Sequence, residues 1–116
     1  MSAKKRTAPD VQSRRRWRRR GWIALLAIAL LLALDWSRAP SRQVTARLEL
    51  AAIAHYQTWI SPWLQRGGVR CRFDPSCSRY AAAVVARDGF VRGNLRALGR
   101  LTRCGPWTGA GTVDPP

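Results

Sequence analysis

Histidine and acidic residues are scarce in this sequence, and their scarcity limits the chemistry that it can perform. One histidine and six acidic residues occur among 116 residues. Acid–base and nucleophilic catalysis usually need paired carboxylates, or a histidine close to a nucleophile. The sequence shows neither pattern, and it has no glycine-rich phosphate-binding loop. We therefore expect a protein that is not an enzyme and that takes no cofactor.

Negative charge is nearly absent, whereas positive charge is abundant. Twenty-one Lys and Arg residues against six acids give a net charge of +15. So basic a chain needs an anionic partner, and phospholipid head groups and nucleic acid are the two candidates. Six tryptophans beside two tyrosines and two phenylalanines favour a bilayer interface. Because no groove-binding motif is recognisable, we predict an anionic phospholipid membrane as the partner, and no nucleic acid.

The basic residues are densest in the first 21 positions. Three lie at positions 4–6, and six arginines surround Trp17. Like charges at this density repel one another, so residues 1–21 are predicted to form a disordered arm. Such an arm is either a solvated tail or an anchor on anionic lipid, where each basic residue contributes about 1 kcal/mol. We favour the lipid anchor because an apolar run follows directly.

The apolar run extends from Ile23 to Leu34 and is bracketed by Trp22 and Trp36. As a helix, the bracketed segment would be about 21 Å long, which is shorter than the ~30 Å hydrocarbon core of a bilayer. We predict a short membrane anchor at residues 22–36, with a tryptophan at each interface. A signal peptide cleaved after residue 39 is the alternative, but proline at the next position disfavours cleavage.

Basic residues on the two sides of this run bear on membrane sidedness. Nine lie just before it, and three follow within the next twenty positions. The positive-inside rule then places the N-terminus in the cytoplasm and, if the segment spans, sends the following domain outside. A shallow helix in the inner leaflet would instead leave that domain at the cytoplasmic face, so both arrangements stay open.

A linker at residues 37–42 leads to a predicted domain at residues 43–116. Ser41 is a plausible N-cap for a helix from about residue 43 to residue 60. The pair Ser61-Pro62 then ends this helix or starts a short turn, with the serine as a cap.

This long helix is apolar on most of its circumference. Such a helix is either enclosed by protein or in contact with a membrane. We expect one face to pack on the domain and the other, which carries Trp59 and Trp63, to contact lipid. An ordinary core helix is the alternative.

Two further helices are predicted, at residues 75–88 and 91–103. Asp74 and Pro75 are typical of an N-cap and a first helical position, and Gly89 is typical of a helix end. Because the connection is so short, the two helices must be antiparallel neighbours. The predicted fold is therefore all-α: a small domain of one long apolar helix plus an antiparallel helical hairpin, after an N-terminal membrane-associated segment.

The second helix of this hairpin has two predicted faces. Its apolar residues indicate an inner face at Val91, Leu95, Leu98 and Leu101. Gly93 and Gly99 lower helix propensity, so a close contact between helices is expected to explain both. The opposite face is a stripe of arginines without acidic neighbours, which favours an anionic surface. The predicted membrane contacts are Trp22, Trp36, Trp59, Trp63, Arg92, Arg96, Arg100 and Arg103.

The three cysteines are expected to converge. Cys77 begins one helix of the hairpin and Cys104 ends the other, and the two helices are nearly equal in length. Cys71, six residues upstream, must lie nearby. The thiols then serve as buried structural groups, as a metal site with His55 as the fourth ligand, or as a disulfide with one thiol left over. Because the C-x5-C-x26-C spacing is not that of a zinc knuckle, we predict no metal site.

Three motifs resemble a known family in their order and spacing. They are Tyr56-Gln57-Thr58-Trp59-Ile60-Ser61-Pro62, Cys71-Arg72-Phe73-Asp74-Pro75-Ser76-Cys77-Ser78-Arg79-Tyr80 and Arg100-Leu101-Thr102-Arg103-Cys104-Gly105-Pro106. From about Ala52 to Asp114 the chain resembles the membrane protein insertion efficiency factor family (YidD-type, formerly "haemolytic domain" proteins). Gly105 stands where that family usually has histidine. The family motif falls on Tyr56, Gln57, Ser61, Pro62, Cys71, Arg72, Phe73, Pro75, Ser76, Cys77, Ser78, Tyr80, Gly93, Arg100, Cys104, Pro106, Asp114 and Pro115.

The resemblance implies an accessory factor that assists the insertion of integral membrane proteins into the bacterial cell membrane. It implies work at the cytoplasmic face of the inner membrane, with the membrane insertase, the Sec translocon or nascent membrane proteins as partners. The alternative function is that of a membrane-active, haemolysin-like protein whose basic, tryptophan-rich surfaces disrupt bilayers.

Overall fold

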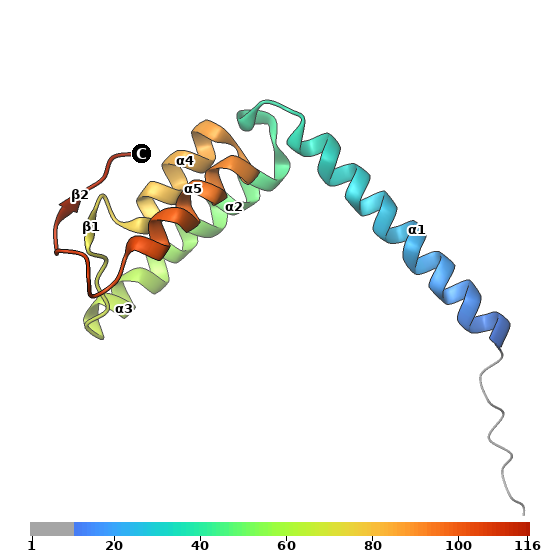
Figure 1. The fold of residues 1–116 in the computed structure, drawn as a ribbon, viewed down its shortest axis with the longest axis horizontal. Helices are drawn as coiled ribbons and strands as arrows, with labels where there is room; N and C mark the ends of the chain where they lie inside the picture. Colours follow the sequence, from blue (N-terminus) through green and yellow to red (C-terminus); the bar gives the residue numbers. More distant parts are fainter. Residues whose placement is uncertain (1–10) are drawn as a thin grey trace, which may run out of the picture. The chain divides into compact units, whose positions relative to one another are not determined.

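A computed structural model describes residues 11–116 of the chain, and the first ten residues lie outside it. The described part is mostly helical, as the all-α prediction requires (Figure 1). The elements, in chain order, are α1 (Val11–Trp36), the 3₁₀ turn η1 (Pro40–Arg42), α2 (Val44–His55), the π-helical turn η2 (Tyr56–Ile60), α3 (Ser61–Arg66), β1 (Phe73–Asp74), α4 (Cys77–Asp88), α5 (Phe90–Arg103) and β2 (Thr112–Val113).

The chain divides into two compact units, residues 1–34 and residues 35–116. The first unit contains most of α1, which already begins at Val11. The prediction of a disordered arm over residues 1–21 is therefore wrong for residues 11–21, because arginine has a high helix propensity and the apolar run continues the same helix. The rest of the predicted arm lies outside the described residues. None of the helices within residues 11–116 has the length and apolar character needed to cross a membrane.

Asp35 belongs to the second unit, although it lies inside the predicted membrane anchor. Its side chain is 8% exposed. One carboxylate oxygen accepts a hydrogen bond from the Val44 amide at 2.8 Å, and the other accepts from the Thr45 amide at 3.0 Å and the Thr45 hydroxyl at 2.6 Å. Asp35 thus satisfies the first free amides of α2. Ser41, the predicted cap, lies instead in η1, and the domain begins at residue 35 and not at residue 43.

Asp35 gives a testable pH dependence. Hydrogen bonds from the Thr45 hydroxyl and from the amides of Thr45 and Val44 hold its pKa below the ordinary aspartate value of 3.8. When folding lowers the pKa of a carboxyl group, that group stabilises the folded state at pH values above the pKa that it has in the unfolded chain. This stabilisation is lost as the pH falls through the lower pKa that it has in the folded protein. We expect Asp35→Asn to lower the urea midpoint at pH 7, and the difference from wild type to shrink at pH 3.

The control for this experiment is Asp74→Asn, which removes an exposed carboxylate of the same type. Asp74→Asn should leave the urea midpoint nearly unchanged at pH 7. If Asp35→Asn lowered the urea midpoint as much at pH 3 as at pH 7, the ionised Asp35 carboxylate would not be the group that caps α2.

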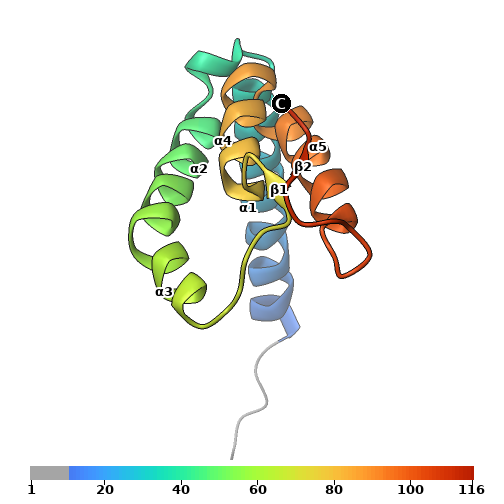
Figure 2. The same ribbon diagram turned by 90° about the vertical axis from the view of Figure 1, so that its left-hand side faces the viewer.

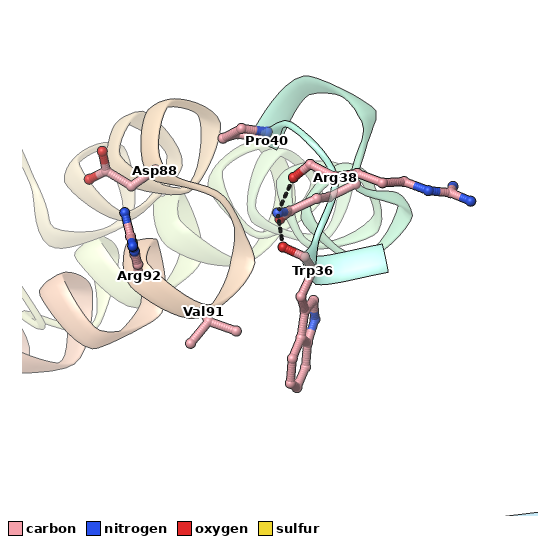
Figure 3. A pocket seen from close by; sticks show the side chains of 7 residues that line it. Trp36, Arg38, Pro40, Asp88, Val91 and Arg92 are labelled. Carbon is pink, nitrogen blue, oxygen red and sulfur yellow. Dashed lines mark hydrogen bonds between the residues drawn. The ribbon is translucent and has the colours of Figure 1, made fainter. Parts of the chain in front are cut away.

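Gln43 joins the start of the second unit to the turn between α4 and α5. Its buried side-chain nitrogen donates to the backbone oxygens of Trp36 at 3.3 Å and Arg38 at 3.0 Å, the two dashed contacts in Figure 3. Its side-chain oxygen accepts a hydrogen bond from the Phe90 amide at 2.8 Å. The Trp36 and Phe90 rings stack beside it with centroids 5.9 Å apart. The amide of Gln43 therefore fixes three backbone groups at this end of the domain.

Of the two alternatives predicted for Ser61-Pro62, the pair starts a short helix, α3, and does not end the helical segment; Ile60, and not Ser61, holds the cap position. The chain continues through η2 into α3, and Ser61 itself has helical dihedral angles. A π-helical turn widens the backbone, so that the ring and the missing amide of Pro62 are accommodated within the first turn of α3. The result is one nearly continuous helical segment from Val44 to Arg66, with Pro62 inside it.

The packing of α4 and α5 depends on small side chains. In Figure 2, α4 lies between α2 and α5, and it contacts both. The core lies at this α4–α5 contact, at Tyr80, Val84, Val85 and Ala97. A Cβ atom built on Gly93 would lie 2.5 Å from the Cα atom of Val85, so the close contact predicted for Gly93 is confirmed. At Gly99 a Cβ would have no neighbour within 4 Å, and there the prediction is wrong.

The ends of the two helices differ slightly from the prediction. Ser76, and not Asp74, holds the N-cap position of α4, because Asp74 is part of β1. The segment after α5 folds back onto the domain as β2, which pairs in parallel with β1. Phe73 is in register with Thr112, and Asp74 with Val113. This short sheet brings the last residues of the chain beside the loop that precedes α4 (Figure 1).

Candidate functional site

The three cysteines meet where α4 begins and α5 ends. The sulfur of Cys71 is 3.1 Å from that of Cys77 and 3.8 Å from that of Cys104. All three sulfur atoms lie within 4.8 Å of one another. Their convergence was predicted from the equal lengths of the two helices, and the structure confirms it. All three are free thiols.

The pKa values of two of the three cysteine thiols are shifted in opposite directions. Burial and the sulfur–sulfur hydrogen bond to Cys71 raise the pKa of Cys77 to about 12. Burial acts to raise the pKa of Cys71 as well, but its hydrogen bond with the Cys77 thiol and hydrogen bonds from the Phe73 and Cys77 amides lower this pKa below its usual value. The Cys77 amide is 3.2 Å from the Cys71 sulfur. Of these two thiols, Cys71 is the one that ionises first.

A cleft of about 330 Å³ opens beside the cysteines. All three cysteines line it, together with apolar side chains from α3 and α5 such as Leu64 and Leu101. Three polar residues of the family motif reach the same cleft, namely Ser61, Ser76 and Ser78. The cleft therefore joins all three motifs identified in the sequence.

Arg100 is the centre of a second cluster and is fully buried. Its guanidinium carbon lies 4.3 Å from the ring centroid of Tyr80 and 4.7 Å from that of Phe73. It also donates to the backbone oxygens of Ser76 at 3.3 Å and Asp114 at 3.0 Å. The Asp114 carboxylate completes the environment at 3.3 Å from its Nε atom. Arg100 was predicted to contact a membrane, and this is wrong, because its charge is used inside the domain.

The remaining motif residues have separate structural roles. Arg72 holds the C-terminal segment, since its guanidinium donates to the Thr108 oxygen at 3.1 Å and its own backbone oxygen accepts from the Gly111 and Thr112 amides. The ring of Trp107 lies against Gly105, where it occupies the space that a side chain would need. Tyr56 lines the cleft, Gln57 is partly buried in η2, Pro75 is partly buried before α4, and Pro62, Pro106 and Pro115 are exposed.

The apolar side of α5 faces outward. Val91, Leu95, Leu98 and Leu101 are 40%, 66%, 56% and 51% exposed. They were predicted to form the inner face, and this is wrong. The inner face is Gly93, Ala97 and Arg100, because small side chains let α5 approach α4 more closely than leucines could. An amphipathic helix with its apolar side outward needs a covering partner.

Three of the four arginines on α5 have acidic neighbours, namely Arg96 and Arg103 in addition to Arg100. Arg96 is 3.3 Å from the carboxylate of Asp88, and Arg103 is 3.2 Å from that of Asp114. The predicted stripe without acidic neighbours is therefore wrong. The side chains of Arg96 and Arg103 remain more than half exposed, and Arg92 is exposed as well. A basic margin thus accompanies the apolar stripe of α5.

The predicted tryptophan contacts are divided between the two units. Trp59 and Trp63 are 69% and 71% exposed on the helical segment after α2, and Trp22 is exposed on α1. Trp36 is less exposed, because it stacks on Phe90. His55 lies beside Trp59, with ring centroids 6.3 Å apart, and it is not one of the groups that surround the cysteines.

Sequence reasoning did not identify Asp35, Gln43 or Asn94. Asn94 donates to the Glu49 carboxylate at 2.8 Å and thereby links α5 to α2. The sequence did contain an indication of the role of Asp35. It is a single acid at the end of an apolar run, and a charge near apolar residues needs a hydrogen-bond partner. Gln43 and Asn94 gave no comparable signal, because amide side chains are common on helix surfaces.

Comparisons with known proteins agree with the motifs. The sequence profile of a family described as "Putative membrane protein insertion efficiency factor" matches residues 45–116. A protein of that description from Laribacter hongkongensis is 46% identical over 70 residues, which cover 60% of this chain and 96% of the relative. A Moorella thermoacetica protein is 47% identical over 66 residues, covering 57% and 89%. One from Corynebacterium jeikeium is 49% identical over 55 residues, covering 47% and 66%. No solved structure matches the chain.

Proposed function

Because the chain belongs to the membrane protein insertion efficiency factor family, we propose that it assists the insertion of integral membrane proteins into the bacterial cell membrane. The observation that carries this proposal is the outward apolar stripe of α5 (Val91, Leu95, Leu98 and Leu101) on a domain that matches the family. A folded domain of this size rarely leaves one whole apolar helix face uncovered without a partner. The proposed role is one of binding, with no catalytic step.

The covering partner is a membrane or an apolar segment within it. Arg92, Arg96 and Arg103 border the apolar stripe, and their exposed guanidinium groups suit lipid phosphates. In this arrangement the α5 leucines enter the boundary between head groups and acyl chains. The exposed indoles of Trp59 and Trp63 provide further interfacial contacts.

The finer assignment concerns partners and sidedness. The domain works at the cytoplasmic face of the inner membrane, close to the insertase, the Sec translocon or nascent membrane proteins. The support is the dense basic charge before the apolar run of α1, which favours a cytoplasmic N-terminus. An N-terminal segment that stays in the inner leaflet would keep the domain on that side. Labelling of intact cells at a cysteine introduced by Val113→Cys, an exposed position outside the cysteine cluster, compared with the wild type, tests this assignment.

The double substitution Leu95→Ser and Leu98→Ser tests the α5 surface. Each leucine side chain contributes about 1.5–3 kcal/mol when fully buried, so losing two partly inserted leucines should cost about 2 kcal/mol, or about 30-fold in vesicle affinity. Flotation with vesicles of phosphatidylglycerol and phosphatidylcholine measures this affinity. Insertion of a reporter membrane protein, in cells depleted of the wild-type protein, should fall in parallel.

The matched control is Val113→Ser, because Val113 is 74% exposed but lies on β2 and is not part of the apolar stripe of α5. It should bind vesicles and support insertion like the wild type. Unchanged binding of the double variant would exclude the α5 surface as the membrane contact. Release of an entrapped dye by the wild type, with no effect of depletion on reporter insertion, would favour the membrane-disrupting alternative.

A further inference from the structure

Within residues 11–116, three cysteine thiols from different segments lie together, and the proposed function assigns them no role. Cys71 comes from the loop before β1, Cys77 is the first residue of α4, and Cys104 immediately follows α5. We infer that these three cysteines bind one thiophilic metal ion, Zn²⁺ or Cu⁺, as a three-sulfur site. This inference does not depend on the proposed function, and it replaces the expectation that the chain has no metal site.

The distances suit a shared metal better than a disulfide. With a Zn–S bond of about 2.3 Å, tetrahedral geometry separates two sulfur ligands by about 3.8 Å. The separation of Cys71 and Cys104 is 3.8 Å, that of Cys71 and Cys77 is 3.1 Å, and all three sulfurs lie within 4.8 Å of one another. A disulfide would engage two of these sulfurs and leave the third beside it without a role. A metal ion engages all three.

The surroundings favour thiolate ligands. The Cys77 amide, at the positive end of the α4 helix, donates to the Cys71 sulfur at 3.2 Å. Such amide–sulfur hydrogen bonds orient metal-bound thiolates and offset their charge. Arg70 lines the same cleft. Its positive charge offsets part of the negative charge of three thiolates.

The ligand set is limited to sulfur. Within residues 11–116, no histidine or carboxylate joins the three cysteines. Three thiolates suffice for trigonal Cu⁺, whereas tetrahedral Zn²⁺ would keep one position for water or another ligand. That position would face the cleft lined by Leu64 and Leu101. Hard cations such as Mg²⁺ and Ca²⁺ require oxygen ligands and do not suit the site.

The test uses the full chain, reduced and freed of metal. Co²⁺ serves as an absorbing substitute for Zn²⁺, and Zn²⁺ should displace it at one equivalent per chain with loss of the thiolate charge-transfer band. In a separate arm, Cu⁺ should be withdrawn from a colorimetric chelator at one equivalent. Bound metal should protect all three thiols from a thiol reagent.

Single substitutions identify the ligands. Cys71→Ser, which changes a loop residue, and Cys104→Ser should each weaken metal binding by more than about 100-fold. Circular dichroism of each variant verifies that it is folded, and the thiol-protection assay on the wild type does not require any variant. His55→Ala is the matched control and should bind metal like the wild type.

Three results would overturn the inference. One is binding weaker than that of an unfolded peptide of the same residues, and another is metal that protects only two of the three thiols. The third is a loss of affinity in His55→Ala equal to that in the cysteine variants, which would mean a different ligand set. Stoichiometric binding with protection of all three thiols supports it.

Discussion

Arg100→Ala should destabilise the domain by about 3 kcal/mol, although arginine on a helix is usually a surface residue. The guanidinium is fully buried between the rings of Phe73 and Tyr80 and is paired with Asp114. Its removal leaves a cavity between two rings and takes one of its two arginine partners from the partly buried Asp114 carboxylate, and such losses cost about 3–5 kcal/mol when fully buried. Urea unfolding followed by circular dichroism measures the effect.

The control is Arg96→Ala, which removes the same side chain one turn earlier on α5. Its side chain is 56% exposed, and its guanidinium lies 3.3 Å from the Asp88 carboxylate. Surface ion pairs of this kind contribute about 0–1 kcal/mol, so the urea midpoint should move little. Equal losses in the two variants would show that the buried contacts of Arg100 contribute no more than a surface ion pair. Arg100→Lys should recover only part of the stability, because an ammonium group cannot stack between two rings.

Gly93→Ala, which adds one methyl group, should lower the free energy of unfolding by about 2–3 kcal/mol. A Cβ atom at residue 93 would lie 2.5 Å from the Cα atom and 2.8 Å from the amide nitrogen of Val85, and 2.9 Å from the backbone oxygen of Val84. All three are backbone atoms, so α4 and α5 must move apart to accept it. Overpacking of this kind costs about 1–3 kcal/mol. The thermal midpoint of the full chain measures it.

Gly99→Ala in the same helix should have the opposite sign. Gly99 is exposed, and a Cβ there would have no neighbour within 4 Å. Alanine is a better helix former than glycine by about 1 kcal/mol, so the thermal midpoint should rise. If Gly93→Ala also raised the midpoint, the helices would not touch at residue 93.

The helices and the convergence of the cysteines could be predicted because they depend on local sequence signals. Gly89 ends one helix, and two helices of similar length on either side of it return Cys104 to the level of Cys77. Neither inference requires knowledge of distant contacts. Two predicted helix boundaries were less accurate. At Asp74 a short strand takes the place of the expected helix start. Before Pro62 a π-helical turn, and not a helix end, leads into α3.

The face of α5 was predicted wrongly because hydrophobic periodicity cannot distinguish a core from a membrane contact. Leucines at helical spacing fit either one. A second periodic signal was present, since Gly93, Ala97, Arg100 and Cys104 follow each other at spacings of four, three and four. Small residues on one side of a helix are typical of a close helix contact. The burial of Arg100 could not be predicted, because its partner Asp114 comes from a segment without helical periodicity.

The two ends of the second unit are held by unrelated interactions, and this bears on how the protein opens locally. The hydrogen bond between the Phe90 amide and Gln43 spans 47 positions of the chain, and Asp35 caps α2 at the same end. Deuterium uptake at Phe90 therefore requires release of the Gln43 side chain, whereas uptake at Thr112 and Asp114 requires release of the C-terminal segment from the backbone oxygens of Arg72 and Asp74. A ligand or membrane that slows deuterium uptake at one end of the unit and not at the other would then be identified as binding to, and stabilising, that end.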